Sequence, residues 1–593
     1  MRGGVLWTYT DPIPPSGHPF DPMTLSYTYD VLVLGAGLAG MRAALAAHTE
    51  GVSVAILSKV HPVRSHSNAA QGGINAALTD RGDHWEDHAF ETVKGSDYLG
   101  DQDAIEILAE EAGQDILTLE HMGVIFNRNE EGRLGTRRFG GQKRARTFFV
   151  SDFTGQAILH VLYEQVLKAQ LPVFEEWFAT SVVRDDDGRC AGVVAFDIRT
   201  SRFAFLKAKA VIIAAGGLGR IFEPSTNAMI CTGDGIAIAY RAGAPLMDME
   251  MVQYHPTTLK GKGLLMSEAA RGEGAYLLNK DGERFMESYA PNMMELASRD
   301  VVSRAEQIEI NEGRGIDGCV LLDCRHLGKR FIQERLRQIC EEAKTFANVD
   351  MTEEPVPIRP GMHYQMGGIK TDVHGRCWDI EGHWSGVQGL FAAGETACLS
   401  LHGGNRLGAN SLLDTVVFGR RAGTCAAAYA KSVEEPKVSN TVAKPDHQTV
   451  QDLLNRKNTG DTVAAIRLNL GMTMNHHLGV FRDHDGMMEA QSAIRQLRDR
   501  WQCVGIHDKG QVFNTSLVRL LELGMMLDCA ETIVLGALIR KESRGAHFRT
   551  DYLHRDDEDW LKHILLYNQE EGPPQVDFLP VRITQWTPQV RLY

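Results

Sequence analysis

The sequence predicts an α/β fold in which one nucleotide-binding domain is built from two separate stretches of the chain. Residues 29–34 form an apolar run that ends at glycine, followed by an Ala-rich helical segment at 41–48 and a second apolar run at 52–57. This order is typical of a β-α-β unit. The strand-then-glycine pattern recurs at 207–217 and at 389–394. We therefore expect the chain to leave this domain and to return to it later.

The segments between and after these patterns predict further domains. Residues 251–360 mix helical patterns, Gly-rich turns and a Pro-rich stretch, which indicates an inserted capping domain, and residues 449–540 carry long helical patterns. Residues 541–593 are charged and irregular. The predicted organisation is an N-terminal extension at 1–26, the nucleotide-binding domain at 27–250 and 361–433, the capping domain at 251–360, a helical domain at 449–540 and a small C-terminal domain at 541–593.

Composition and charge exclude several classes of function. The net charge of -14 over 593 residues argues against nucleic-acid binding, which needs a basic surface. The 10 cysteines contain no C-x-x-C pair, so we expect no metal or iron–sulfur site within this chain. No apolar run approaches the roughly 20 residues that cross a bilayer, and residues 1–26 lack the apolar core of a secretory signal. Any membrane role would come through partners.

A glycine motif follows the first predicted strand. Gly35, Ala36, Gly37 and Gly40 belong to the run G-A-G-L-A-G between that strand and the first helix. In such a motif the glycines allow a tight turn, close approach of a pyrophosphate and packing of helix on strand. An NAD site would add an acidic residue at the end of the second strand, but that strand ends at Ser58 and Lys59. The pattern therefore favours a Rossmann-like FAD-binding domain.

The next segment, 58–73, is polar and Gly-rich, and from its residues alone His66 is predicted to be a polar loop histidine. The segment nevertheless resembles the one in succinate dehydrogenase flavoprotein subunits, where a histidine at the position of His66 is covalently bound to the flavin. Val63 replaces the threonine usual in that family. The resemblance continues through residues 94–103, 138–142, 232–235, 253–257, 271–274, 299–302, 363–368, 402–408, 542–547 and 555–557.

The resemblance implies roles for particular residues. Dicarboxylate binding falls to His255, Ser267, His363 and Arg406, with Ser267 standing where the family often has threonine. Proton transfer falls to Arg299, with Glu268 and Arg271 as its relay, although Arg299 by itself would be read as a charge on a helix surface. Further flavin contacts are expected from Ser58, Lys59, Ser65, Gly72, Gly73, Asp234, Glu395, Ser411 and Leu412.

The resemblance also implies an activity and its partners. We expect oxidation of succinate to fumarate with covalent FAD, an iron–sulfur subunit that accepts the electrons and a membrane anchor that reduces quinone. The expected location is the cytoplasmic side of a bacterial inner membrane, as a peripheral subunit. The alternatives are a fumarate reductase, an L-aspartate oxidase and a catalytically silent assembly scaffold. Gln71 argues against the reductase, because a related group of reductases has Glu at this position.

Overall fold

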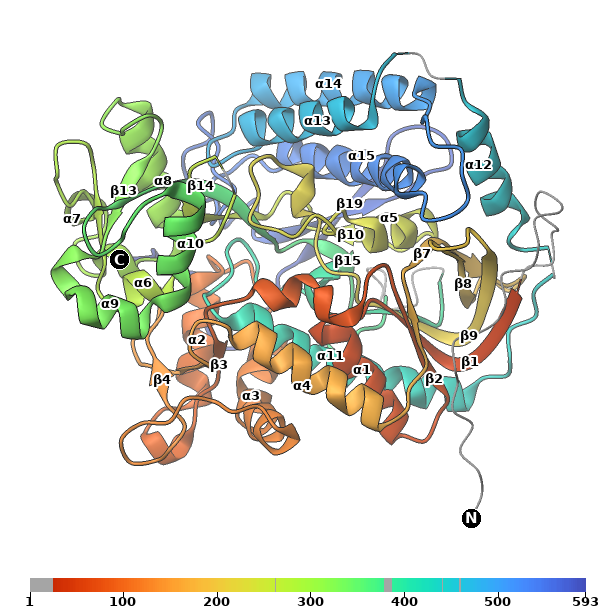
Figure 1. Cartoon of the computed structure of the whole chain (residues 1–593), viewed down its shortest axis with the longest axis horizontal. Coiled ribbons are helices and arrows are strands. Elements are labelled where there is room, and N and C mark those ends of the chain that lie inside the picture. Colours follow the sequence, from red (N-terminus) through yellow and green to blue (C-terminus); the bar gives the residue numbers. More distant parts are fainter. Residues whose placement is uncertain (1–24, 262, 378–386, 440, 458–459, 593) are drawn as a thin grey trace.

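The computed structural model describes residues 25–261, 263–377, 387–439, 441–457 and 460–592 (Figure 1). Most of the predicted N-terminal extension therefore lies outside the described residues. Its last two residues begin the first strand, β1 (Leu25–Leu34). The borders predicted between the domains stay predictions.

The centre of the molecule is a seven-stranded sheet. Its order is β6-β2-β1-β9-β8-β7, with β16 also paired to β9. Strands β1, β2, β6, β9 and β16 run parallel, and β7 and β8 complete the sheet in antiparallel pairs. Ile212 of β9 is paired with Phe391 of β16, so the predicted return of the chain to this domain is confirmed. The strand bounds are β2 (Val54–Ser58), β6 (Val173–Glu175), β7 (Trp177–Arg184), β8 (Cys190–Asp197), β9 (Phe203–Ile213) and β16 (Leu390–Ala392).

Alternation along β1 divides the core between the two faces of this sheet. Val31 and Val33 pack into a cluster with five helices, whereas Leu32 and Leu34 pack into the cluster on the other face. Figure 1 shows three of these helices, α1, α4 and α11, side by side in the lower half of the view. The five helices are α1 (Leu38–Thr49), α2 (Trp85–Gly95), α3 (Gln102–Met122), α4 (Thr154–Lys168) and α11 (Asn410–Ser432).

The inserted cap has its own sheet and its own core. The strand order is β11-β14-β13-β12, and a separate apolar cluster lies between this sheet and the cap helices. Figure 1 shows the cap at the left end of the molecule. Its strands are β11 (Val252–Leu259), β12 (Tyr276–Leu278), β13 (Val320–Asp323) and β14 (Val356–Gln365). Its helices are α6 (Ala269–Gly272), α7 (Met286–Tyr289), α8 (Arg299–Asn311), α9 (Lys329–Arg335) and α10 (Arg337–Ala347).

The last third of the chain contains the predicted helices and an additional pair of strands. The helices are α12 (Lys444–Asn455), α13 (Val463–His477), α14 (His484–Cys503) and α15 (Thr515–Ile539). Strands β18 (Lys562–Tyr567) and β19 (Gln575–Pro580) extend a five-stranded sheet of order β17-β15-β10-β18-β19. Its other members are β10 (Leu246–Met247), β15 (Gly368–Lys370) and β17 (Ala397–Cys398). The C-terminal segment therefore shares a sheet with residues of the FAD-binding region.

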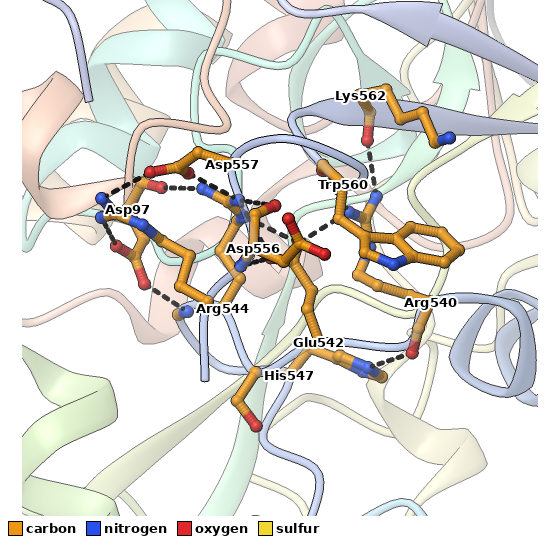
Figure 2. A network of polar contacts seen from close by, with 12 residues as sticks. Asp97, Arg540, Glu542, Arg544, His547, Asp556, Asp557, Trp560 and Lys562 are labelled. Carbon is orange, nitrogen blue, oxygen red and sulfur yellow. Dashed lines mark hydrogen bonds and ion pairs between the residues drawn. The ribbon is translucent and has the colours of Figure 1, made fainter. Parts of the chain in front are cut away.

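A buried network of charges holds this C-terminal segment in place (Figure 2). The Glu542 carboxylate accepts hydrogen bonds from Arg540 Nη1 at 3.1 Å and from Arg544 Nε at 2.7 Å. Arg544 Nη1 also donates to the Asp97 carbonyl at 2.9 Å, and Gly545 N donates to the Asp97 carboxylate at 2.8 Å. Because each buried arginine has a carboxylate partner, the network can be buried without an unpaired charge.

None of the helices within the described residues is both long and apolar enough to cross a membrane.

Candidate active site

One cavity brings together nearly all the residues singled out in the sequence. It has a volume of about 460 Å³ and lies between the central sheet and the cap. Two of the candidates, Gly40 and Arg271, do not line it. Those that do are Gly35, Ala36, Gly37, Ser58, Lys59, Ser65, His66, Gly72, Gly73, Asp234, His255, Ser267, Glu268, Arg299, His363, Glu395, Arg406, Ser411 and Leu412.

The glycine motif forms a backbone cradle at one end of the cavity. Gly35 has a φ of +114°, and a Cβ there would lie 2.2 Å from the Ala214 carbonyl oxygen. A Cβ on Gly40 would lie 1.9 Å from the Gly35 carbonyl oxygen. Helix α1 begins directly after Gly37, and its first turn contains no acidic residue. Its free N–H groups and positive dipole end suit the pyrophosphate of a dinucleotide, and this cradle fits FAD.

Lys59 lines the cavity, but its ammonium group is bound within the protein. Nζ donates to Asp234 Oδ2 at 2.8 Å, to Glu522 Oε1 at 2.7 Å and to Thr232 Oγ1 at 2.9 Å. Although burial alone would lower it, the two carboxylates raise the pKa of Lys59. Lys59 therefore fixes the turn that carries Asp234. A ligand in the cavity would contact the aliphatic stem and backbone of Lys59 rather than its ammonium group.

His66 lies in the segment that follows β2 and lines the cavity, and one of its ring nitrogens already accepts a hydrogen bond. Ala228 N donates to His66 Nδ1 at 3.2 Å. Burial, helped by the charge of Arg220, lowers the pKa of His66 to about 4. The ring is therefore neutral at physiological pH, and Nε2 is the nitrogen left for another partner.

Three side chains form a pocket for anions beside the cap. The rings of His255 and His363 lie 4.8 Å apart in an edge-to-face arrangement. The guanidinium of Arg406 lies over the Tyr364 ring at 4.6 Å. Its hydrogen bonds go to neutral oxygens, Leu407 O at 3.4 Å and Ser411 Oγ at 3.3 Å. Arg406 Nε and His255 Nε2 have no hydrogen-bond partner among the described residues.

Burial changes the charges in this pocket. It lowers the pKa of Arg406 to about 9, with Arg299 adding to the effect. It also lowers the pKa values of His255 and His363 far below the usual range, again with a contribution from Arg299. A buried cation without a carboxylate partner is costly, so the pocket suits a ligand that brings negative charge.

Arg299, Glu268 and Arg271 form a continuous buried chain behind this pocket. Arg299 Nε donates to Glu268 Oε2 at 2.9 Å, and Arg271 Nη2 lies 3.5 Å from Glu268 Oε1. Gly140 N also donates to Glu268 Oε1 at 3.0 Å. Burial alone would raise the pKa of Glu268, but Arg299 and Arg271 hold it at about 2. The carboxylate is therefore ionised between two guanidiniums.

Gln253 belongs to this site, although its side chain was not singled out in the sequence. Arg299 Nη1 donates to its Oε1 at 3.1 Å, and its Nε2 donates to the Arg406 carbonyl at 2.8 Å. The amide therefore links the two arginines. The available signal was its spacing, because Gln253 stands two residues before His255 and alternate residues of a strand share a face.

The position of His363 depends on an irregularity in β14. The pairing of β11 with β14 runs from Gln253 with Tyr364 to Tyr254 with Met362, so His363 is skipped in the register. Its Nδ1 lies 2.8 Å from Thr226 Oγ1. Bulges re-aim side chains next to active sites, and this one brings His363 beside His255.

The comparisons with known proteins agree with this geometry. A family model described as "FAD binding domain" matches residues 30–412, and one described as "Fumarate reductase flavoprotein C-term" matches residues 467–593. A succinate dehydrogenase flavoprotein subunit of Rickettsia conorii is 46% identical over 95% of this chain and 97% of its own length. A fumarate reductase flavoprotein subunit of Mycobacterium tuberculosis is 44% identical over 95% of this chain and 99% of its own.

Solved structures give the same result. A mutated E. coli quinol fumarate reductase chain has a TM-score of 0.92 at 38% identity, covering 96% of this chain and 99% of that one. Mycobacterium smegmatis Sdh1 in complex with UQ1 has a TM-score of 0.83 at 33% identity, covering 95% and 96%. Because the matches run along nearly the whole chain and include its FAD-binding domain, the protein belongs to the succinate dehydrogenase and fumarate reductase flavoprotein family.

Proposed function

We propose that this chain is the flavoprotein catalytic subunit of a succinate dehydrogenase, which oxidises succinate to fumarate. The observation that carries the proposal is the position of Arg406, which is buried beside two histidines and next to the Arg299–Glu268 pair and forms no ion pair with a carboxylate of the described residues. A small dianion would satisfy these donors. The names of the similar proteins support the same chemistry.

FAD fits the rest of the cavity. The glycine cradle and the N-terminus of α1 would hold its pyrophosphate, and Asp234 and Glu395 would accept hydrogen bonds from its hydroxyl groups. Bound there, FAD supplies the hydride acceptor for the oxidation. The arrangement of the other groups around that acceptor is the contribution of this chain.

The chain's own residues would orient the substrate and move its proton. Arg406, His255 and His363 would hold the two carboxylates, with Ser267 as a neutral donor, and the closed cap would exclude water. Arg299, held by Glu268 and Gln253, would first give one of its own protons to Glu268 and then take the proton from the substrate carbon. Glu268, with a pKa of about 2, would hold the transferred proton only briefly and pass it to Arg271 as Arg271 releases one of its own towards solvent.

We further propose that FAD is attached covalently through His66. Support comes from the neutral His66 ring, which lines the cavity. Because Nδ1 accepts the Ala228 N–H, Nε2 carries the ring proton and would lose it as the bond to the flavin forms. Protein from its native host, denatured in acid and digested, should contain a fluorescent peptide that includes His66. His66→Ala should release all flavin on denaturation, with His61→Ala as the control. Full release from the wild type would contradict the attachment.

The electrons must then leave the flavin. We propose an iron–sulfur subunit as the acceptor and a membrane anchor that passes the electrons to quinone, with this chain a peripheral subunit on the cytoplasmic side of a bacterial inner membrane. The bacterial relatives and the quinol named for a solved neighbour support this arrangement. Purification from native membranes under mild detergent should recover an iron–sulfur protein together with this chain.

The activity test compares both directions. Wild-type complex should reduce a dye with succinate, and Arg299→Gln should lower kcat about 100-fold or more while flavin stays bound, since a positioned proton-transfer group contributes ~10²–10⁴-fold. Arg304→Gln, on the same helix but outside the cavity, is the control. A wild type that reduces fumarate faster than it oxidises succinate would favour the reductase, and oxidation of L-aspartate by oxygen would favour the oxidase.

A further inference from the structure

The cavity wall contains a contact between the cap and the FAD-binding domain to which the proposed reaction assigns no role. Gln71 precedes Gly72 in the loop of the FAD-binding domain and is 5% exposed. Its Nε2 donates to Glu342 on cap helix α10, at 3.0 Å to Oε1 and 3.1 Å to Oε2. Gln338, about one turn earlier on α10, donates from its own Nε2 to Glu342 Oε1 at 2.9 Å. All three side chains line the cavity.

This contact sets the direction in which the Gln71 amide points. An ionised carboxylate only accepts hydrogen bonds, so the amide must turn its NH₂ group towards Glu342. The amide oxygen, Oε1, then points away from the cap helix. That oxygen is buried and has no partner among the described residues. An unpaired buried oxygen in a ligand cavity is an acceptor ready for a donor on the ligand.

Both sides of the contact are anchored. The carboxylate of Asp152, from the FAD-binding domain, accepts the backbone N–H of Gln338 at 2.7 Å and so caps the first turn of α10. On the other side, Arg137 Nε donates to the Gly72 carbonyl at 3.1 Å and its Nη2 to the Gln71 carbonyl at 3.2 Å. The helix and the loop are therefore held face to face at two points.

We propose that Glu342 is a positioning residue that clamps the closed cap onto the FAD-binding domain and fixes the Gln71 amide with its oxygen towards the flavin. The inference deepens the proposed function and rests on it, because it requires flavin and dicarboxylate in the cavity. Opening the cap would separate α10 from the loop and release the amide. Cap closure and the polarity of the flavin surroundings are thereby coupled.

The first test removes the clamp. Glu342→Ala in the holoenzyme should raise the KM for succinate and the Kd for malonate, a dicarboxylate that is not oxidised, by about 10-fold, as expected for loss of a charge-assisted hydrogen bond. The midpoint potential of the flavin should also shift, which loss of stability alone would not cause. The matched control is Glu341→Ala, the neighbouring carboxylate on α10, which is exposed and pairs with Arg337 at 3.0 Å.

The second test exchanges the partners. Gln71→Glu would place two carboxylates at about 3 Å, where both cannot be ionised, so one takes up a proton. Asp152 and Arg137 face the pair and are unchanged in every variant. Burial already raises the pKa of Glu342 in the wild type, and a second carboxylate would raise it further. Malonate binding by Gln71→Glu should therefore show a pH-dependent step at higher pH than any step in the wild type. The double variant Gln71→Glu with Glu342→Gln restores one donor and one acceptor and should lose that step.

The outcomes separate the two proposals. If the wild type neither binds malonate nor oxidises succinate, the proposed function fails. If it does both, and Glu342→Ala matches Glu341→Ala in KM, Kd and potential, Glu342 has no positioning role. A pH step that persists in the double variant would also overturn the inference, because the proton would then be taken up elsewhere in the site.

Discussion

Glu306 lies on α8, about two turns after Arg299, and its carboxyl group is deeply buried. The residue is fully buried, and neither carboxyl oxygen forms a hydrogen bond within the described part of the chain. Burial raises the pKa of Glu306 well above its usual range, and the charge of Arg271 opposes this only in part. The folded protein therefore favours the neutral form of this carboxyl group to a higher pH than the unfolded chain does.

This neutrality has a measurable consequence for stability. The unfolded chain ionises Glu306 above about pH 4.3 whereas the folded chain does not, so Glu306 lowers stability increasingly as the pH rises above that value. We expect the thermal midpoint of Glu306→Gln to rise relative to that of the wild type as the pH increases above about 4.3. Thermal unfolding at a series of pH values checks this.

The matched control is Glu309, three residues further along the same helix. Its carboxylate accepts hydrogen bonds from Arg314 at 2.6 and 2.8 Å. These bonds are the main reason why the pKa of Glu309 is lowered. Its contribution is present above the unfolded pKa and lost as the pH falls. Glu309→Gln should therefore lower the thermal midpoint at neutral pH. Equal behaviour of the two variants would contradict the assignment for Glu306.

At the residue scale, the sequence could predict which side chains share the site but not what each one touches. His255, His363, Arg299 and Arg406 do meet in one cavity. The ion pair of the Lys59 ammonium with Glu522 could not be predicted, because Glu522 lies 463 positions away on a helix without a recognisable motif. The contact of Gln71 with Glu342 was hidden for the same reason.

At the scale of elements, the approach of α1 to α11 decides the shape of the cofactor site. Gly423 of α11 packs against α1 so closely that a Cβ would lie 2.1 Å from the Ala43 carbonyl oxygen. The N-terminus of α1 faces the glycine cradle, and the first turn of α11 contributes Ser411 and Leu412 to the same cavity. A change in the distance between these two helices would therefore alter the shape of the proposed flavin site.

We expect Gly423→Ala to destabilise the protein by about 1–3 kcal/mol through overpacking and to weaken FAD retention. The measurements are the thermal midpoint and the FAD content after gel filtration, made in the His66→Ala background so that FAD can dissociate. Thr424→Ala, at the exposed next position of the helix, is the control. Unchanged stability in Gly423→Ala would mean that the two helices can separate at little cost.

Regular elements were predictable and irregular ones were not. The strands at 29–34, 52–57 and 389–394 follow from local apolar patterns, and the predicted α/β fold is confirmed. The register skip at His363 depends on how β11 and β14 meet. Strands β18 and β19 form in a segment read as irregular, because they complete a sheet whose other members are two or three residues long.

At the scale of the whole molecule, His563 connects three distant parts of the chain. It lies on β18, with Nδ1 2.7 Å from Asp248 Oδ2 and Nε2 3.2 Å from Asp101 Oδ1. Asp248 follows β10, and Asp101 precedes α3. Burial alone would lower the pKa of His563, but the two carboxylates raise it to about 10. The imidazolium therefore joins the C-terminal strand to the FAD-binding region.

Removal of this cation should destabilise the protein by roughly 3–5 kcal/mol, because two buried carboxylates lose their common partner. A raised folded pKa means that the stabilisation is complete below the unfolded pKa of about 6.5 and is lost as the pH rises towards 10. His563→Gln should thus differ most from the wild type near pH 6 and least near pH 10, as thermal midpoints would report. His554→Gln, at an exposed position, should match the wild type throughout.

The pairing of β9 with both β1 and β16 has a consequence for synthesis on the ribosome. Neighbouring strands of this sheet come from residues 25–34, 203–213 and 390–392, so a nascent chain carries β1 and β9 long before β16 exists. At ~5–20 residues per second, that interval lasts roughly ten seconds or more. Throughout it one edge of β9 lacks its native neighbour β16, and unpaired edges invite association with other chains. Cofactor capture is thus a late event, and the growing chain needs protection until then.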